Sequence, residues 1–142
     1  MKNLAKGGYV MGRNEELAPA AMVRVILITP FDAPRALEIT NSLTGFRALV
    51  GGYLEGIRLG RDLHAYVDDN GHRKQLAPNG LASQIYGRTH PTAAIKEVLG
   101  PMVLVGSLNR AGRPDGFDHD VPPGLLEGLI AAAVGLHEEK RA

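Results

Sequence analysis

The sequence predicts the α+β class, with a mostly antiparallel sheet covered on one side by two or three helices in a single domain over 22–142. Three observations predict it. Short β-branched runs are separated by turn residues, so consecutive strands are expected to return on one another. Helical apolar stripes occur between such hairpins rather than after every strand. The length of 142 residues, without an internal repeat, suits one domain preceded by an N-terminal arm, 1–21, that is flexible or packs on a partner.

The first elements of the domain are two strands and a helix. The β-branched, apolar run 22–29 is typical of a central strand. Residues 36–40 alternate between apolar and polar, so they predict a half-buried strand that pairs back on the first. A helix should follow over 43–50, because its apolar residues recur at three- and four-residue spacing behind Ser42, a good N-cap. The Gly51-Gly52 pair is expected to end this helix.

The middle of the chain reads as a meander of three strands. Residues 53–59 predict a strand, and a bulge at Gly56 is expected because the apolar residues do not alternate strictly. Residues 63–67 predict the next strand, with alternate side chains on one face. The dipeptide Asn70-Gly71 favours a tight hairpin turn, so residues 72–76 are expected to return as an antiparallel strand.

The last third of the domain predicts two helices around one strand. Residues 81–89 leave helix and strand open. A short helix is expected over 93–99, followed by a buried strand over 102–106. A polar loop, 109–123, then leads to a C-terminal helix over 124–140.

A series of motifs between residues 22 and 106 carries a resemblance to a known family. The motifs are the strand 25–30, the string Leu49-Val50-Gly51-Gly52-Tyr53-Leu54-Glu55, the turn Asp69-Asn70-Gly71, the stretch Leu76-Ala77-Pro78-Asn79, and Leu99-Gly100 followed by Val103-Leu104-Val105-Gly106. In this order they resemble domain-of-unknown-function family 3846, which is common in phage, plasmid and other mobile-element genomes. The string 50–55 is the most specific of these motifs.

Three departures from the family pattern bear on function. Residues 1–21 have no counterpart in it. Asn70 and His72 stand where the family has an acidic residue and Lys, and Gly80 stands where it has Arg after the Pro-Asn pair. The resemblance implies a small α+β domain in the cytoplasm of a bacterial host, carried by a mobile element, and it implies no activity.

The composition excludes several classes of site and partner. With no Cys in the chain, disulfides, zinc–thiolate sites and cysteine nucleophiles are excluded. Sixteen Lys and Arg against 15 Asp and Glu give a formal charge of +1, which disfavours a protein that neutralises many nucleic-acid phosphates. The longest apolar runs are too short to span a bilayer, and no signal peptide is visible, so we expect no membrane partner and a cytoplasmic location.

Tyr53, Glu55 and Arg58 form the first set of candidate site residues. Tyr53 and Glu55 follow the Gly51-Gly52 pair and are expected on the same side of a strand, where the glycines would let a ligand approach backbone N–H groups. Arg58 would add positive charge for an anionic ligand. The alternative is a helix cap followed by a strand with an outward polar face.

Asn79, Tyr86, Arg88 and His90 form the second set, in a segment without clear periodicity. Such segments on a rigid scaffold often bind ligands. Arg88 would hold a phosphate or carboxylate, and Tyr86 would stack on a base or ring. The alternative is an ordinary solvated connection in which Asn79 caps a turn.

Two further patterns give weaker evidence for a functional site. Basic residues spread over consecutive predicted strands would form one positive patch or a solvated sheet edge: Arg58, Arg61, His72, Arg73 and Lys74. Residues 115–120 fail the spacing of a calcium loop and lack the partners of a zinc site. We therefore expect neither a metal nor a cofactor.

These candidates favour a non-enzymatic binding module for a small anionic, nucleotide-like ligand. If the mobile-element association holds, that ligand would be a host immune signal that the protein sequesters. The alternative is an interaction protein that binds a host protein or forms a homo-oligomer through the terminal helix and the N-terminal arm. A nucleotide hydrolase and a nucleic-acid-binding protein are disfavoured, because no catalytic spacing is present and aromatic residues are few.

Overall fold

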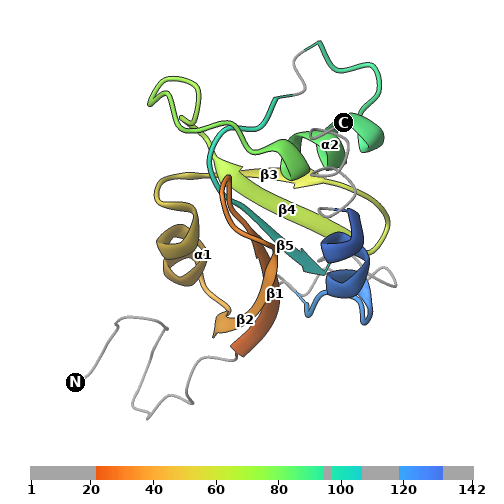
Figure 1. Ribbon diagram of the computed structural model, residues 1–142. Coiled ribbons are helices and arrows are strands. Elements are labelled where there is room, and N and C mark those ends of the chain that lie inside the picture. The colour runs from red at the N-terminus through yellow and green to blue at the C-terminus, as the bar shows by residue number, and fades with distance from the viewer. Residues whose placement is uncertain (1–21, 95–96, 107–118, 133–142) are drawn as a thin grey trace, which may run out of the picture.

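Five antiparallel strands form a sheet at the centre of the fold (Figure 1). The computed structural model describes residues 22–94, 97–106 and 119–132. The strands lie in the order β2-β1-β5-β4-β3, and their bounds are β1 Met22–Ile28, β2 Arg35–Thr40, β3 Leu54–Arg58, β4 Leu63–Asp68 and β5 Met102–Gly106. Two helices are α1 (Leu43–Val50) and α2 (Gly80–Thr89), and a further helix covers residues 125–132 of the described chain. The predicted α+β class is confirmed.

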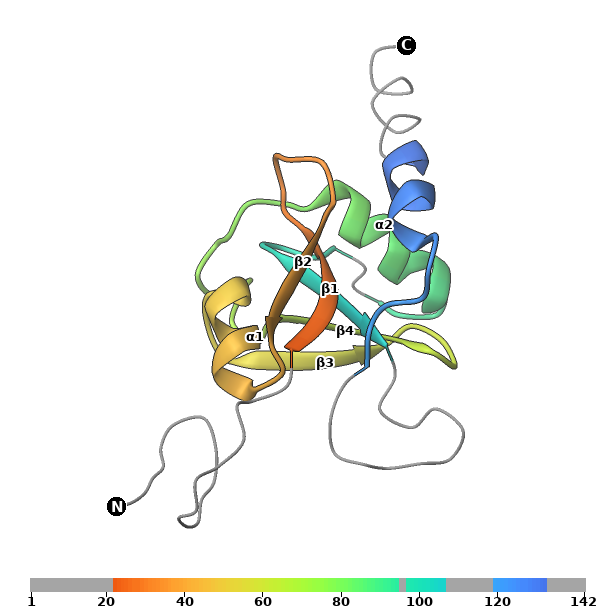
Figure 2. The ribbon, with the colours of Figure 1, turned by 90° about the horizontal axis from the view of Figure 1, so that it is seen from below.

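Helices pack on both faces of the sheet, which corrects the expectation of one covered side (Figures 1 and 2). On one face, here the α1 face, Phe46 of α1 packs with Val25 of β1. On the opposite face, the α2 face, Leu81 of α2 and Leu129 of the last helix pack with Ile26. Because successive strand residues point to opposite faces, β5 and residues 25–28 of β1 are buried on both faces and form continuous apolar runs.

The helix α1 begins and ends as its local sequence predicts. The Ser42 hydroxyl accepts a hydrogen bond from the Gly45 N–H at 3.0 Å, so Ser42 is the N-cap. Gly51 has φ of 91°, and its N–H donates to the Arg47 carbonyl at 2.8 Å. This left-handed conformation is one that glycine adopts without steric cost.

The bulge expected at Gly56 is absent, and that prediction is wrong. Gly56 pairs directly with Tyr66 in a register that runs without interruption along β3 and β4. Leu54 packs with the core of the α1 face, and Ile57 packs with the core of the α2 face. The apolar residues fail to alternate because both faces are covered, so each face takes its own apolar side chain.

The hairpin expected at Asn70-Gly71 is also wrong, because residues 69–75 form turns and no strand lies over 72–76. Backbone groups of this segment form hydrogen bonds with one another, since the Lys74 N–H donates to the Asn70 carbonyl at 2.9 Å and the Leu76 N–H donates to the Gly71 carbonyl at 3.0 Å. β4 already has β3 on one side and β5 on the other. A strand returning from β4 would therefore have no edge to pair with.

The open alternative at 81–89 resolves as a helix, α2. The helix expected over 93–99 is wrong for the residues described there, because 93–94 are not helical and Leu99 forms a β-bridge with Pro78. Of the C-terminal helix, residues 125–132 are helical. The expected arm 1–21, most of the polar loop and the end of the C-terminal helix lie outside the described residues.

Candidate functional site

A pocket of about 210 Å³ lies on the α2 face where β3 and β4 meet α2, and we name it the β3–α2 pocket. β3 contributes Glu55 and Ile57, and α2 contributes Tyr86. The lining is completed by Val67, Asp68, Asp69, Gly71, His72, Glu97, Val98 and Leu99. Two of the residues predicted from the sequence, Glu55 and Tyr86, thus line one pocket.

The β3–α2 pocket is acidic. Glu55, Asp69 and Glu97 are exposed carboxylates of its lining, and no hydrogen bond or ion pair joins their side chains to another residue of the described ranges. His72 is the one basic side chain in the lining that the structure describes. Uncompensated carboxylates around a hollow create a negative potential, because field lines concentrate in a concave surface.

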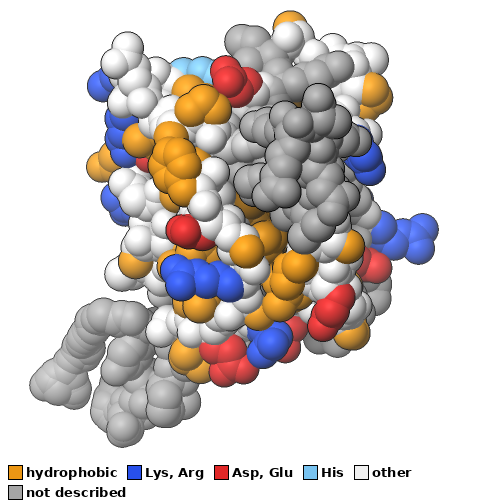
Figure 3. All heavy atoms as spheres, viewed as in Figure 1, with side chains coloured by type: hydrophobic (Ala, Val, Ile, Leu, Met, Phe, Trp, Pro, Cys, Tyr) orange, Lys and Arg blue, Asp and Glu red, His pale blue; other side chains and the backbone are white. Residues whose placement is uncertain are grey.

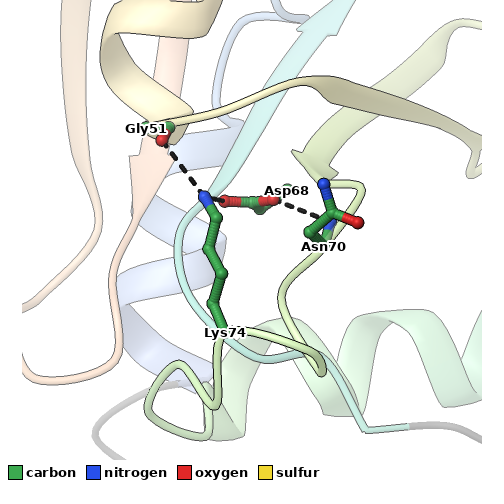
Figure 4. A network of polar contacts seen from close by, with 4 residues as sticks. All are labelled: Gly51, Asp68, Asn70 and Lys74. Carbon is green, nitrogen blue, oxygen red and sulfur yellow. Dashed lines mark hydrogen bonds and ion pairs between the residues drawn. The ribbon is translucent and has the colours of Figure 1, made fainter.

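Asp68 anchors the turn that borders this pocket (Figure 4). Its side chain is 1% exposed, and its Oδ2 lies 2.6 Å from the Lys74 Nζ. The Asn70 N–H donates to Asp68 Oδ1 at 2.8 Å, and the Lys74 Nζ donates to the Gly51 carbonyl at 3.4 Å. Burial raises the pKa of Asp68, but the hydrogen bonds from Lys74 and Asn70 and the charge of Lys74 outweigh it and hold that pKa below its usual value.

Gly52 makes room for this ion pair. A Cβ at position 52 would lie 2.7 Å from the Lys74 Nζ and 2.8 Å from Asp68 Oδ2. The Gly51-Gly52 pair therefore has two structural tasks, since Gly51 ends α1 and Gly52 accepts the close approach of Lys74 and Asp68. The group that approaches this backbone is the Lys74 ammonium of the chain itself, where the sequence analysis expected a ligand.

Asn79 is a buried structural residue with 1% exposure. Its Oδ1 accepts from the Ala82 N–H at 3.2 Å, which makes it the N-cap of α2. Its Nδ2 donates to the carbonyls of Ile28 at 2.9 Å and Gly100 at 2.8 Å. Both amide hydrogens are thereby used, so Asn79 has no donor left for a ligand.

Tyr86 and His90 lie together at the end of α2, whereas Arg88 lies apart. The Tyr86 and His90 rings stack with centroids 4.6 Å apart, and the His90 Nδ1 is 2.8 Å from the Thr89 hydroxyl. Tyr86 faces the core of the α2 face. Arg88 is exposed and does not line the β3–α2 pocket.

Tyr53 and Arg58 are also separated from that pocket. The Tyr53 side chain is 64% exposed, and the Arg47 guanidinium of α1 lies 4.4 Å from its ring centroid. Arg58 alternates with Ile57 along β3 and so points to the opposite face, where its Nε donates to the Gly60 carbonyl at 3.4 Å. Tyr53 and Glu55 were expected on the same side of a strand, but they lie on different sides.

Asp69, His72 and Glu97 were not among the site residues predicted from the sequence. Asp69 was interpreted only as part of a hairpin, and His72 as part of that hairpin and of the basic patch. The turn that replaces the hairpin carries both residues to the pocket. The basic patch expected over consecutive strands loses its basis with that hairpin, and Lys74 is engaged by Asp68. The signal that was available is the pair of adjacent carboxylates, Asp68 and Asp69, one of which is buried and the other exposed.

A second hollow of about 660 Å³ lies between β1–β2 and residues 119–127. Arg24, Asp120 and Glu127 line it together with apolar residues such as Ile26 and Leu126. Figure 3 shows hydrophobic side chains at the centre of this face with charged side chains of both signs around them. None of the site residues predicted from the sequence lines this hollow. Part of its lining, from His119 onward, directly follows residues 107–118, which lie outside the described residues.

Two classes of feature are absent from the described part of the chain. No three His, Asp or Glu side chains there lie close enough to hold a metal ion. No described helix has the length and apolar character needed to cross a bilayer.

The comparisons with known proteins give one match. The model of the family described as a domain of unknown function (DUF3846) matches residues 23–120. No curated protein and no solved structure matches the chain.

Proposed function

Because the chain belongs to the DUF3846 family, whose description carries no activity, we propose a function from geometry: a non-enzymatic binding module that holds a small cationic group in the β3–α2 pocket. One observation carries the proposal. Glu55, Asp69 and Glu97 line a single pocket without an ion-pair partner among the described residues, and Tyr86 forms an aromatic wall. Carboxylates bind ammonium and guanidinium groups by charge-assisted hydrogen bonds, and an aromatic face attracts the same cations.

The charge of this pocket reverses the charge of the expected ligand. The sequence favoured an anionic, nucleotide-like ligand held by Arg58 and Arg88. Both side chains lie outside the lining of the β3–α2 pocket. A phosphate group placed in it would meet Glu55, Asp69 and Glu97 as like charges, so the pocket favours a cation.

The size of the pocket supports a small group. A pocket for a drug-sized ligand has roughly 300–1,000 Å³, whereas the β3–α2 pocket has about 210 Å³. It therefore suits an amine or a guanidinium with a short aliphatic chain. The rigid border formed by the Asp68–Lys74 ion pair supports binding with little reorganisation of the protein.

The alternative functions stay predictions. The interaction protein was expected to use the N-terminal arm and the terminal helix, and the arm and the end of that helix lie outside the described residues. The homo-oligomer, the host immune signal and the mobile-element context likewise stay predictions.

Thermal-shift titration tests the proposed function. We expect agmatine, which carries an ammonium and a guanidinium, to raise the melting temperature, whereas adenosine monophosphate should not. A ligand at 100 times its dissociation constant adds about 2.7 kcal/mol to the free energy of unfolding, which corresponds to a rise of roughly 5–10 °C for a domain of this size.

A matched pair of variants locates the effect. Glu55→Gln should reduce the shift caused by agmatine, and Glu38→Gln, which also neutralises an exposed carboxylate on an edge strand, should not. Stabilisation by the nucleotide alone, or an agmatine shift that Glu55→Gln leaves unchanged, would contradict the proposal.

A further inference from the structure

β3 forms one edge of the sheet, with an outer side that no described strand pairs with. Two hydrogen bonds define its orientation, one from the Asp69 N–H to the Tyr53 carbonyl at 2.9 Å and one from the Leu59 N–H to the Leu63 carbonyl at 3.0 Å. Residues 53 and 59 therefore face β4. Because facing alternates along an antiparallel ladder, the outward-pointing N–H and C=O groups belong to three residues. These are Leu54, Gly56 and Arg58.

The opposite edge, β2, offers less. The backbone N–H and C=O of Arg24 point away from β2, because the N–H donates to Asp120 Oδ1 and the carbonyl accepts from the Val121 N–H. By the same alternation, the outward positions of β2 include Thr40. The Thr40 carbonyl already accepts from the Ser42 N–H at 2.8 Å. The edge with three consecutive free positions in the described chain is therefore β3.

The β3–α2 pocket lies beside this edge. Glu55 and Ile57 line it from β3 itself. A strand that pairs with β3 places alternate side chains on the α2 face, directly opposite Glu55 and Ile57 or diagonal to them. A long basic side chain at such a position would reach Glu55, and from there the carboxylates of Asp69 and Glu97.

Charge selects the kind of strand that fits. If a second copy of the chain paired its β3 antiparallel about Gly56, Glu55 would lie diagonally opposite Glu55 of the second copy. Diagonal neighbours interact across a strand pair, and like charges there are destabilising. A strand with Lys or Arg on that face has the complementary charge instead.

We infer that β3 binds an extended peptide segment of a partner protein, which adds to the sheet as a sixth strand. Lys or Arg at alternate positions of the segment faces α2, and one of these side chains occupies the β3–α2 pocket. Backbone hydrogen bonds to Leu54, Gly56 and Arg58 give affinity, and the carboxylates select basic sequences. This inference rests on the proposed function, because it names the partner that carries the cationic group.

Amide hydrogen exchange of the full chain tests the inference. The probe is a blocked hexapeptide of alternating valine and lysine, and its control is the hexapeptide of alternating valine and glutamate. With the lysine peptide we expect exchange at Leu54, Gly56 and Arg58 to slow by about tenfold or more, because these outward N–H groups become hydrogen-bonded. Glu55 and Ile57 already face β4, so their exchange should change much less.

Variants show whether charge selects the strand. Glu55→Lys should abolish the protection by the lysine peptide. Glu38→Lys, the same charge reversal on the other edge strand, should leave it in place. Both side chains are exposed, so both variants are expected to fold.

Each other outcome overturns the inference in a recognisable way. If agmatine binds but the lysine peptide protects no outward amide, the strand addition is wrong and the cation pocket stands. If neither binds, both proposals fail. Equal protection by the glutamate peptide refutes selection by charge, and protection without peptide that rises with protein concentration assigns the edge to a second copy.

Discussion

Single residues explain why the Gly51-Gly52 string has its composition. Gly51 adopts φ of 91° to end α1, and Gly52 lies against the Lys74 and Asp68 side chains. Asp68 is buried and Lys74 is its cation, so the pair closes the turn 69–75 against the end of α1. The string that looked like a ligand-binding motif is thus explained by an internal ion pair.

Gly52→Ala is predicted to destabilise the fold. The added Cβ would fall within 2.8 Å of atoms of both Lys74 and Asp68, so the ion pair or the backbone must shift, at a cost of about 1–3 kcal/mol. Gly60→Ala is the matched control, because a Cβ there meets nothing within 4 Å. Urea denaturation measures both, and equal stability of the two variants would refute this role of Gly52.

Asp68 is predicted to make stability depend on acid pH. Its native pKa lies below the usual value, so the stabilisation is complete above the unfolded pKa of about 4 and is lost as pH falls from there through the lowered native pKa. Asp68→Asn should be less stable at neutral pH and should flatten that acid limb. Urea midpoints between roughly pH 2 and 7 measure it, and an unchanged slope in the variant would contradict the assignment.

At the scale of elements, sequence reasoning succeeded where local signals decide the structure. α1 has its cap, stripe and stop within ten residues, and all three are confirmed. The hairpin at Asn70-Gly71 failed because β5, distant in sequence, occupies the edge of β4 that the hairpin needs. The bulge at Gly56 failed for a similar reason, since the cover of both faces depends on where α1 and α2 pack.

Only part of the candidate site was predicted from the sequence. Glu55 and Tyr86 were named from the sequence, and the structure brings them to one pocket. Asp69 and Glu97 join them because β4 and the segment before β5 lie side by side, which follows from strand order. Asn79 was predicted to bind a ligand, with a capping role as the alternative, and the structure makes it the N-cap of α2, with an amide that also donates to the carbonyls of Ile28 and Gly100.

The caps of the two helices are predicted to differ in importance. Asn79→Ala removes the cap of α2 and leaves two buried carbonyls without their donors, so a loss of about 2–4 kcal/mol is expected. Ser42→Ala removes a cap bond at a partly buried position and should cost about 1 kcal/mol. Chemical denaturation compares them, and an equal loss would show that the Nδ2 bonds of Asn79 contribute nothing.

At the scale of the whole molecule, a nearly neutral chain concentrates negative charge at one place on its described surface. The formal charge is +1, yet three carboxylates without ion-pair partners in the described chain gather around the β3–α2 pocket. The sheet order explains this, because β3 at the edge brings Glu55 beside the turn that follows β4 and the segment that precedes β5. Net charge therefore carries no information about the charge around this pocket, whereas the strand order accounts for its carboxylates and supports the proposal of a cationic group.

An NMR titration with agmatine tests the central claim most directly. The account predicts that backbone amide shifts of Glu55, Asp69, His72 and Glu97 move together in a saturable way, and that Glu55→Gln weakens binding while Glu38→Gln does not. Saturable shifts at Arg58 or Arg88 with adenosine monophosphate, and none at the pocket with agmatine, would contradict it.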